Sequence, residues 1–138
     1  METLKPKIVL PRYVQRGFVL KHPEWVFLHG HDYMDKGFFG QSEIAHEENV
    51  VAIPVCYKFC HSSSNRFFSD GEFVLYSGYM DAAFRQAVQI ANGRPILPLR
   101  RMGQGCSRMQ EFCPKLYQHL QMRLREVSYP VIEWNYRL

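Results

Sequence analysis

The stretch "SDGEFVLYSGYMDAAFRQAVQIANG", residues 69–93, decides the fold class because it carries the strongest helix signal in the chain. Ser69 and Glu72 have the spacing of a capping box, a pattern that starts helices. Apolar residues then recur at three- and four-residue steps, at Phe73, Tyr76, Met80, Phe84, Val88 and Ala91. Asn92-Gly93 follows as a C-cap. The stretch therefore predicts an amphipathic helix.

Short apolar runs on both sides of this helix predict strands. They are "WVFLHG" at 25–30, "NVVAIPV" at 49–55 and "RPILPL" at 94–99. The run at 49–55 does not alternate with polar residues, which is typical of a strand covered on both faces. "KIVLP" at 7–11 predicts a further strand, and residues 129–138 predict a last one at a sheet edge. Between residues 11 and 25 we expect a weak helical turn that breaks near His22-Pro23.

A second helix is predicted to begin at Pro114, a residue that suits a first helical turn. Its apolar stripe consists of Leu116, Leu120, Leu124 and Val127. Strands that alternate with helices favour an α/β domain with a mostly parallel sheet. The chain length favours a single domain, residues 1–138. Because ligands bind beyond the carboxyl ends of such strands, the loops 30–42 and 99–109 are the candidate site.

Composition and charge exclude several classes of protein. A net charge of +4 is too small and too dispersed to indicate nucleic acid as the partner. The densest basic stretch is either a phosphate contact or a solvated rim, and it contains Arg94, Arg100, Arg101 and Arg108. Without a long apolar run or a signal peptide, we expect a soluble cytoplasmic protein that does not enter membranes. Its four cysteines are then expected to be reduced.

Glycines punctuate both candidate loops, at residues 30, 37, 40, 103 and 105. Glycine lets main-chain N–H groups approach a ligand closely. If a helix begins near Gly40-Gln41, its free amides would favour an anion such as phosphate. The alternative is that these glycines only close the turns between strands and helices.

A metal site and a nucleophile are two other kinds of chemistry to consider. The candidate zinc ligands are His29, His31, Cys56, Cys60 and His61. The cysteine spacing in "CYKFCH" differs from common zinc patterns, so buried histidines and free thiols are favoured and no metal is expected. Cys106 between Gly105 and Ser107 would have loop amides to lower its thiol pKa, but no histidine is placed beside it.

Acidic and aromatic residues complete the first loop. Asp32 and Asp35 would serve as a ribose ligand, a general base or turn residues. Phe38-Phe39 and Phe67-Phe68 would stack on a base or pack as core and lid.

Several motifs are similar to a family of small bacterial and bacteriophage proteins that looks like a divergent branch of the macro-domain superfamily. The motifs, in order, are "HGHD", "KGFFGQS", "NVVAIPV", "FFSDGEF" and "MGQGCSRM", with "CPKLYQHL" opening the last helix. The family pattern reads FGDN, GxGGQA, GIPT, FFSD and GxGTGLA. The resemblance extends from about residue 20 to residue 127.

This resemblance implies a three-layer α/β/α sandwich with a mixed, mostly parallel sheet and a pocket for ADP-ribose. In macro domains the first loop lies near the distal ribose and the second surrounds the diphosphate. The ligand-binding residues implied here are Gly30, Asp32, Gly37, Phe39, Gly40, Gln41, Ser42, Gly103, Gly105, Cys106, Ser107 and Arg108. If the protein is an enzyme, Asp32 would orient water to hydrolyse an ADP-ribose bond, and no cofactor is expected.

The sequence also departs from the family pattern. Phe39 replaces a glycine, Val55 replaces a threonine, and Cys106-Ser107-Arg108 replaces Thr-Gly-Leu. A bulky Phe39 would partly fill the cleft. The alternative function is therefore a degenerate macro-like phage protein that binds a host protein in the host cytoplasm. Its C-terminal "VIEWNYRL" would then pair with that partner or with a second copy in a homodimer.

Overall fold

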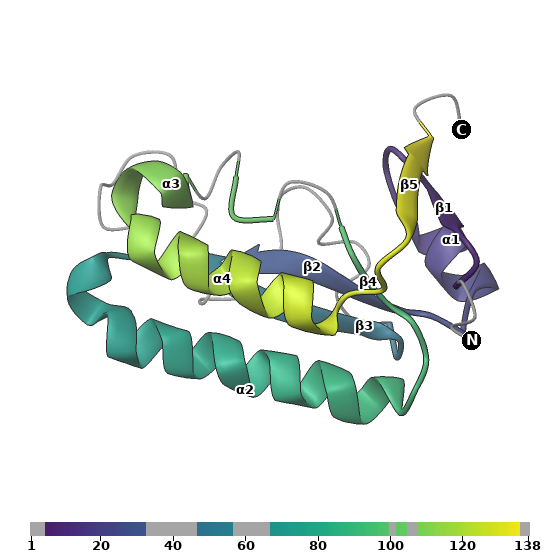
Figure 1. Cartoon of the computed structure of the whole chain (residues 1–138), viewed down its shortest axis with the longest axis horizontal. Coiled ribbons are helices and arrows are strands. Elements are labelled where there is room, and N and C mark those ends of the chain that lie inside the picture. The colour runs from purple at the N-terminus through teal and green to yellow at the C-terminus, as the bar shows by residue number, and fades with distance from the viewer. Residues whose placement is uncertain (1–4, 33–46, 57–66, 100–101, 105–107, 136–138) are drawn as a thin grey trace.

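Three parallel strands form the central sheet. The computed structural model describes residues 5–32, 47–56, 67–99, 102–104 and 108–135. The strand order is β3-β2-β4, with β2 at Val26–Asp32, β3 at Val50–Cys56 and β4 at Ile96–Pro98 (Figure 1). Both strand pairs are parallel, and the three strands predicted at these places are confirmed.

Two helices cover one face of this sheet. They are α2 (Phe73–Ala91) and α4 (Pro114–Val127), which lie side by side and run in the same direction in Figure 1. Both helices are confirmed predictions. The first core forms between them and the sheet, where Met80 and Phe84 of α2 and Leu116 of α4 pack on strand residues such as Leu28. The apolar stripe predicted for α2 is wrong at Val88, whose side chain is 51% exposed while neighbouring Ala87 is buried.

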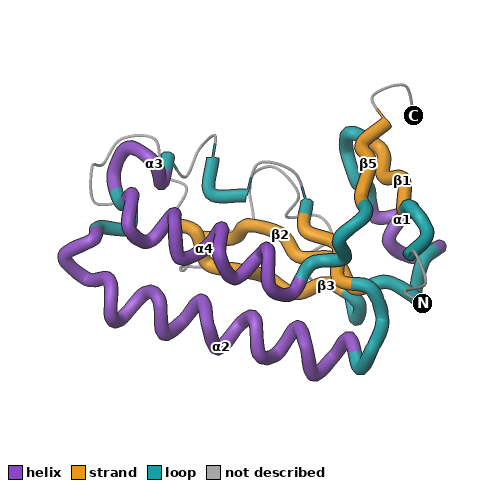
Figure 2. The backbone as a smooth tube through the Cα atoms, viewed as in Figure 1, coloured by secondary structure: helices purple, strands orange, loops and turns teal. Residues whose placement is uncertain are grey.

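The opposite face of the sheet packs on the two ends of the chain. β1 (Ile8–Pro11) and β5 (Ile132–Asn135) form a separate two-stranded parallel sheet, which stands apart from the central sheet in Figure 2. Together with α1 (Arg16–Lys21) these strands bury a second core against Phe27 of β2. The helical turn, the first strand and the C-terminal edge strand are confirmed. The chain thus has the predicted α/β fold, and every described strand pair is parallel.

The start of α2 corrects the predicted capping box. A 3-10 turn at Asp70–Glu72, labelled η3, precedes the helix, and the Ser69 hydroxyl accepts from the Gly71 N–H at 3.1 Å. Glu72 makes no capping bond, because the tight turn moves it to the N-cap position of α2. The C-cap prediction is confirmed, since Asn92 has the left-handed φ of 46° and Gly93 a φ of 92°.

Asp70 joins this turn to the other covering helix. Its carboxylate accepts hydrogen bonds from the backbone N–H groups of Lys115 and Leu116, both at 3.0 Å. These amides belong to the first turn of α4, where no intrahelical acceptor exists. A residue of the "FFSD" motif therefore caps a helix that begins 44 positions later, at Pro114. No helix in the described ranges is both long and apolar enough to cross a membrane.

Candidate functional site

The strands that lead into the two candidate loops are neighbours in the sheet. β2 and β4 pair in parallel, and the Leu99 N–H donates to the Leu28 carbonyl at 2.8 Å. Beyond these strands the two segments still touch. A Cβ atom added to Gly30 would lie 3.4 Å from Cγ of Met102. The carboxyl ends of β2 and β4 therefore lie close together.

The two described loop glycines both have packing reasons to be glycine. Gly103 has a φ of +82°, and an added Cβ would lie 2.8 Å from Cδ2 of Leu120 and 3.0 Å from Sδ of Met109. A side chain at Gly30 would meet Val55 at 3.3 Å as well as Met102. Both glycines thus let a strand end or loop pack closely on its neighbours, which is the turn-closing alternative left open by the sequence.

Much of the predicted ligand-binding set lies outside the described residues. This applies to Gly37, Phe39, Gly40, Gln41, Ser42, Gly105, Cys106 and Ser107, and to Arg100, Arg101, Cys60 and His61. The backbone of Asp32 ends β2 and pairs with Cys56 across a register shift. Its assignment to ribose or water stays a prediction.

The two described arginines of the basic stretch support local structure. Arg94 ends α2, because its guanidinium donates to the carbonyls of Ile90, Ala91 and Pro23 at 2.6–3.1 Å. Arg108, a predicted ligand residue, has a left-handed φ of 45° and forms an ion pair with Glu111 at 2.5 Å.

Aromatic rings further hold the Arg108 guanidinium. It lies 5.9 Å from the ring centre of Phe67 and 5.3 Å from that of Phe112, and these two rings are stacked 3.9 Å apart. A base that stacks on Phe67, as predicted, would thus have to compete with Phe112, which already stacks on this ring. A ligand phosphate at Arg108 would have to compete with Glu111 in the same way.

The described potential ligands do not form a metal site. His29 is fully buried within β2, and Cys56 is a buried free cysteine at the end of β3. No group of three or more potential ligands gathers among the residues with described positions. Cys113 is also a buried free cysteine, and burial, together with the charge of Asp70, raises the pKa of its thiol to about 12. At neutral pH this thiol is protonated and is not a nucleophile.

A cavity of about 570 Å³ lies beside β4, next to the segment that follows it. Its lining comes from three places: the chain after β4, the C-terminal half of α4, and the passage from α4 into β5. The polar and aromatic lining residues are Gln104, Gln121, Arg125, Ser128, Tyr129 and Trp134. Met102, which meets Gly30, belongs to the same lining.

The sequence did not single out Arg125 as a candidate site residue, and it placed Trp134 only within the C-terminal strand predicted to pair with a partner or a second copy. Tyr129 brings them together, since its N–H donates to the Ile96 carbonyl of β4 at 2.8 Å and its hydroxyl donates to the carbonyl of Pro6. No local pattern signals such a meeting of distant segments.

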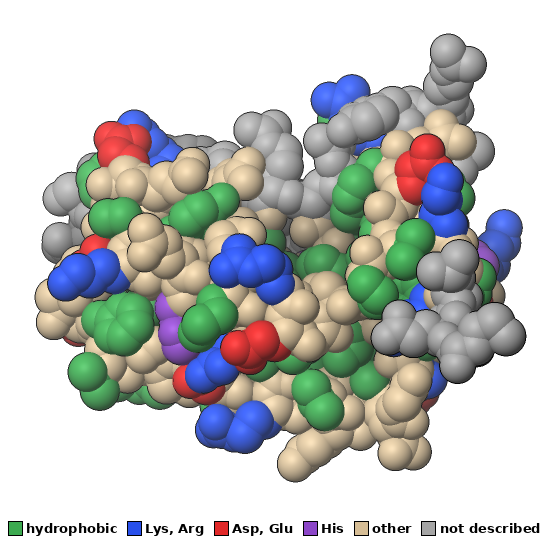
Figure 3. Space-filling model, viewed as in Figure 1, with side chains coloured by type: hydrophobic (Ala, Val, Ile, Leu, Met, Phe, Trp, Pro, Cys, Tyr) green, Lys and Arg blue, Asp and Glu red, His purple; other side chains and the backbone are tan. Residues whose placement is uncertain are grey.

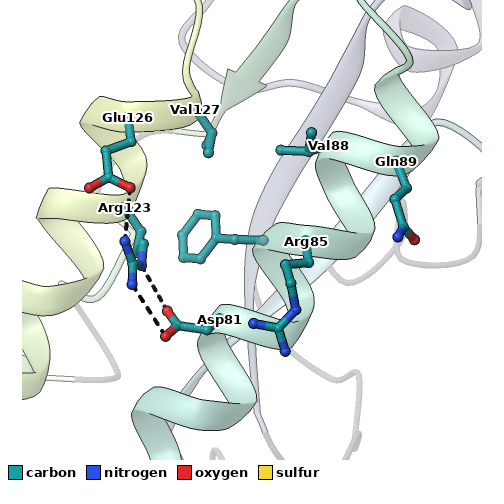
Figure 4. Close-up of a pocket in the computed structure, with 8 residues that line it drawn as sticks. Asp81, Arg85, Val88, Gln89, Arg123, Glu126 and Val127 are labelled. Carbon is teal, nitrogen blue, oxygen red and sulfur yellow. Dashed lines mark hydrogen bonds and ion pairs between the residues drawn. The ribbon is translucent and has the colours of Figure 1, made fainter.

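A second cavity, of about 420 Å³, lies on the other side of α4, in the groove between α4 and α2 (Figure 4). Arg123 spans this groove and donates to Asp81 Oδ1 at 2.8 Å and to Glu126 at 2.9 Å. His119 Nε2 lies 2.7 Å from the same Asp81 oxygen. Burial opposes ionisation of Asp81, but these hydrogen bonds outweigh it and lower the pKa of its carboxyl.

A third cavity, of about 560 Å³, borders the end of α1. There the side-chain amide nitrogen of Asn49 lies 3.0–3.2 Å from the carbonyls of Val19, His22 and Trp25. The amide thus ties the end of α1 and the following turn to the start of β3. Asn49 and Arg94 both donate to backbone carbonyls here, so these two polar side chains have structural roles.

The fold and the site define an α/β domain with parallel sheets and a cavity beside the carboxyl end of an edge strand. Residues 10–123 match DUF7831, a family of unknown function, and the chain belongs to that family. No curated protein and no solved structure matches the chain. The family match includes β2, β3, β4 and α2, whereas Arg125 and β5 lie beyond it.

Proposed function

We propose that the protein binds ADP-ribose or a related nucleotide in a macro-like cleft at the carboxyl ends of β2 and β4. The observation that carries this proposal is the cavity beside β4, whose lining includes Met102 and Gln104 from the segment after that strand. Its volume of about 570 Å³ is in the range of small-molecule sites. The parallel pairing of β2 with β4 supports a ligand that spans both strand ends.

The proposal keeps the residue roles predicted from the sequence. Backbone amides of residues 39–42 and 103–107 would face the diphosphate, and Asp32 would face the ribose. If the protein is an enzyme, Asp32 orients a water molecule that attacks the ADP-ribose bond. The proposed location is the cytoplasm, which for a phage-encoded protein is that of the host.

Charge on the visible face does not indicate nucleic acid as the ligand. In Figure 3, basic and acidic side chains are interspersed over the face that carries α2 and α4. Such a face lacks the single-sign field that a nucleic-acid backbone requires.

Isothermal titration calorimetry with ADP-ribose tests the proposal. We expect measurable heat with the native protein and none with Gln121→Trp, because the new ring would fill the cavity from α4. The matched control is Met122→Trp, at the next position of the same helix, where the native side chain is 38% exposed and does not line the cavity. Absence of heat from the native protein at millimolar ADP-ribose would contradict the proposal.

The alternative function, binding of a host protein or a second copy, is favoured by the position of β5. In the described sheet β5 has one strand neighbour, β1, so its other side is an edge. Removing residues 129–138 is a poor test, because Tyr129 bonds to β4 and β5 covers the second core. Light scattering coupled to size exclusion, over a wide range of protein concentration, tests the homodimer directly.

A further inference from the structure

The cavity beside β4 has one charged side chain among its described lining residues, that of Arg125. Arg125 is exposed and forms no ion pair within the described residues. Two positions earlier on the same helix, Arg123 is neutralised by Asp81 and Glu126. A lone cation at the wall of a concave site attracts an anionic ligand.

Ser128 adds a polar group beside that cation. Ser128 lines the same cavity, and its hydroxyl oxygen, which is buried, has no hydrogen-bond partner within the described part of the chain. Buried polar groups are nearly always hydrogen-bonded, so an orphaned hydroxyl at a cavity wall indicates a missing partner. Arg125 and Ser128 are three positions apart at the end of α4, a spacing that places both on one side of a helix.

Trp134 supplies a planar apolar surface in the same wall. Its side chain is partly buried and packs against the second core, which fixes the indole. Neighbouring Tyr129 is held at both ends by its bonds to Ile96 and Pro6, and Lys5 Nζ lies 5.6 Å from its ring centre. Rigid aromatic walls of this kind stack on nucleobases.

We infer that this wall is a subsite for a nucleoside 5′-phosphate. The base lies against the Trp134 ring. The phosphate accepts hydrogen bonds from the Arg125 guanidinium and, once that side chain rotates toward the cavity, from the Ser128 hydroxyl. The inference rests on the proposed function, because it assigns the adenosine phosphate half of the ligand to α4 and β5.

Trp134 itself reports on the subsite. The chain has two tryptophans, so Trp25→Phe leaves Trp134 as the only indole. We expect AMP and ADP-ribose to quench its emission and ribose 5-phosphate, which has no base, to leave it unchanged. Unchanged emission with both nucleotides would overturn the inference.

Calorimetry on the native protein separates the two proposals. Heat from ADP-ribose without a change in Trp134 emission would overturn the subsite and leave the proposed function standing. Quenching by AMP without any heat from ADP-ribose would contradict the proposed function and leave the subsite standing.

Arg125→Gln distinguishes a ligand contact from a purely structural role. Arg125 is also the basic residue in the last turn of α4, where a cation offsets the negative end of the helix dipole. For a phosphate contact we expect AMP affinity to fall about tenfold or more, because charge-assisted hydrogen bonds are the strong ones. The control Arg85→Gln, on α2 beside the other cavity, should leave AMP affinity unchanged. Equal AMP affinity of native and Arg125→Gln protein would overturn the assignment.

Discussion

The two sides of α4 use the same residue types in different ways. Toward α2, Arg123 is joined to Asp81 and Glu126, and His119 completes the cluster. Toward β4, Arg125 faces a larger cavity without a described acidic partner. The difference teaches that a basic residue such as Arg123, whose charge is already neutralised, is weak evidence for a ligand in its groove.

The largest expected effect is on stability, at Gly103 in the segment after β4, which packs on Leu120 of α4. Gly103→Ala should lower the free energy of unfolding by about 3 kcal/mol, because the new Cβ would overlap Leu120 and the φ of +82° disfavours alanine. Urea denaturation measures the change. The control is Gly78→Ala in α2, where an added Cβ meets nothing within 4 Å and stability should rise by about 0.5–1 kcal/mol. Equal effects at both positions would contradict this account.

The next largest effect on stability is expected at the start of α4, the helix that carries both Arg123 and Arg125. Asp70→Ala should cost about 1–2 kcal/mol, because it leaves the N–H groups of Lys115 and Leu116 without their acceptor. Glu72→Ala is the matched control and should change stability by less than about 0.5 kcal/mol, since Glu72 makes no capping bond. A loss of stability for Glu72→Ala as large as that for Asp70→Ala would contradict this account and favour the capping box predicted from sequence.

Removing the Asp81 carboxylate, which Arg123 and His119 contact, should lower stability by a smaller and pH-dependent amount. Asp81→Asn should cost about 1 kcal/mol at neutral pH, since Asp81 is partly exposed and solvent screens its ion pairs. The pKa of Asp81 is lowered in the folded protein, so its contribution is present above its ordinary value near 3.8 and lost as pH falls through the folded value.

Chemical denaturation between pH 7 and pH 2 tests this pH dependence. Native protein should lose more stability than Asp81→Asn below about pH 4, because only the native protein has the carboxylate to protonate. Arg85→Gln, which removes a charge beside the same groove that has no ion pair among the described residues, should follow the native curve. Parallel curves for native protein and Asp81→Asn would show that the Asp81 carboxylate contributes nothing to the pH dependence of stability.

The smallest expected effect on stability is at Arg125, on the side of α4 that faces the cavity beside β4. Arg125→Gln should change the free energy of unfolding by less than about 0.5 kcal/mol, because the residue is exposed and has no described ion pair. Thermal unfolding measures it. A loss above 1 kcal/mol would identify Arg125 as a stabilising residue and weaken the contrast between the two sides of α4.

The site was less predictable than the elements that carry it. The strands β2 and β4 were predicted from two apolar runs, and Gly30 and Gly103 were singled out as positions where close ligand approach or a turn requires glycine. Their described surroundings are packing contacts with Met102 and Leu120 rather than a bound anion. The cavity wall of Arg125, Ser128 and Trp134 escaped prediction, because neither its orphaned hydroxyl nor its unpaired charge is visible without neighbours.

The amino-acid order by itself determined the two covering helices α2 and α4, the strands and the α/β class, because apolar periodicity and residues such as Asn92, Gly93 and Pro114 act over a few positions. Only the tertiary structure decided that Asp70 caps α4, that Arg123 is neutralised, and that Arg125 faces a cavity beside Trp134. The physical reason is that hydrogen bonding, charge pairing and cavity shape depend on which distant segments meet. Local patterns do not encode those meetings.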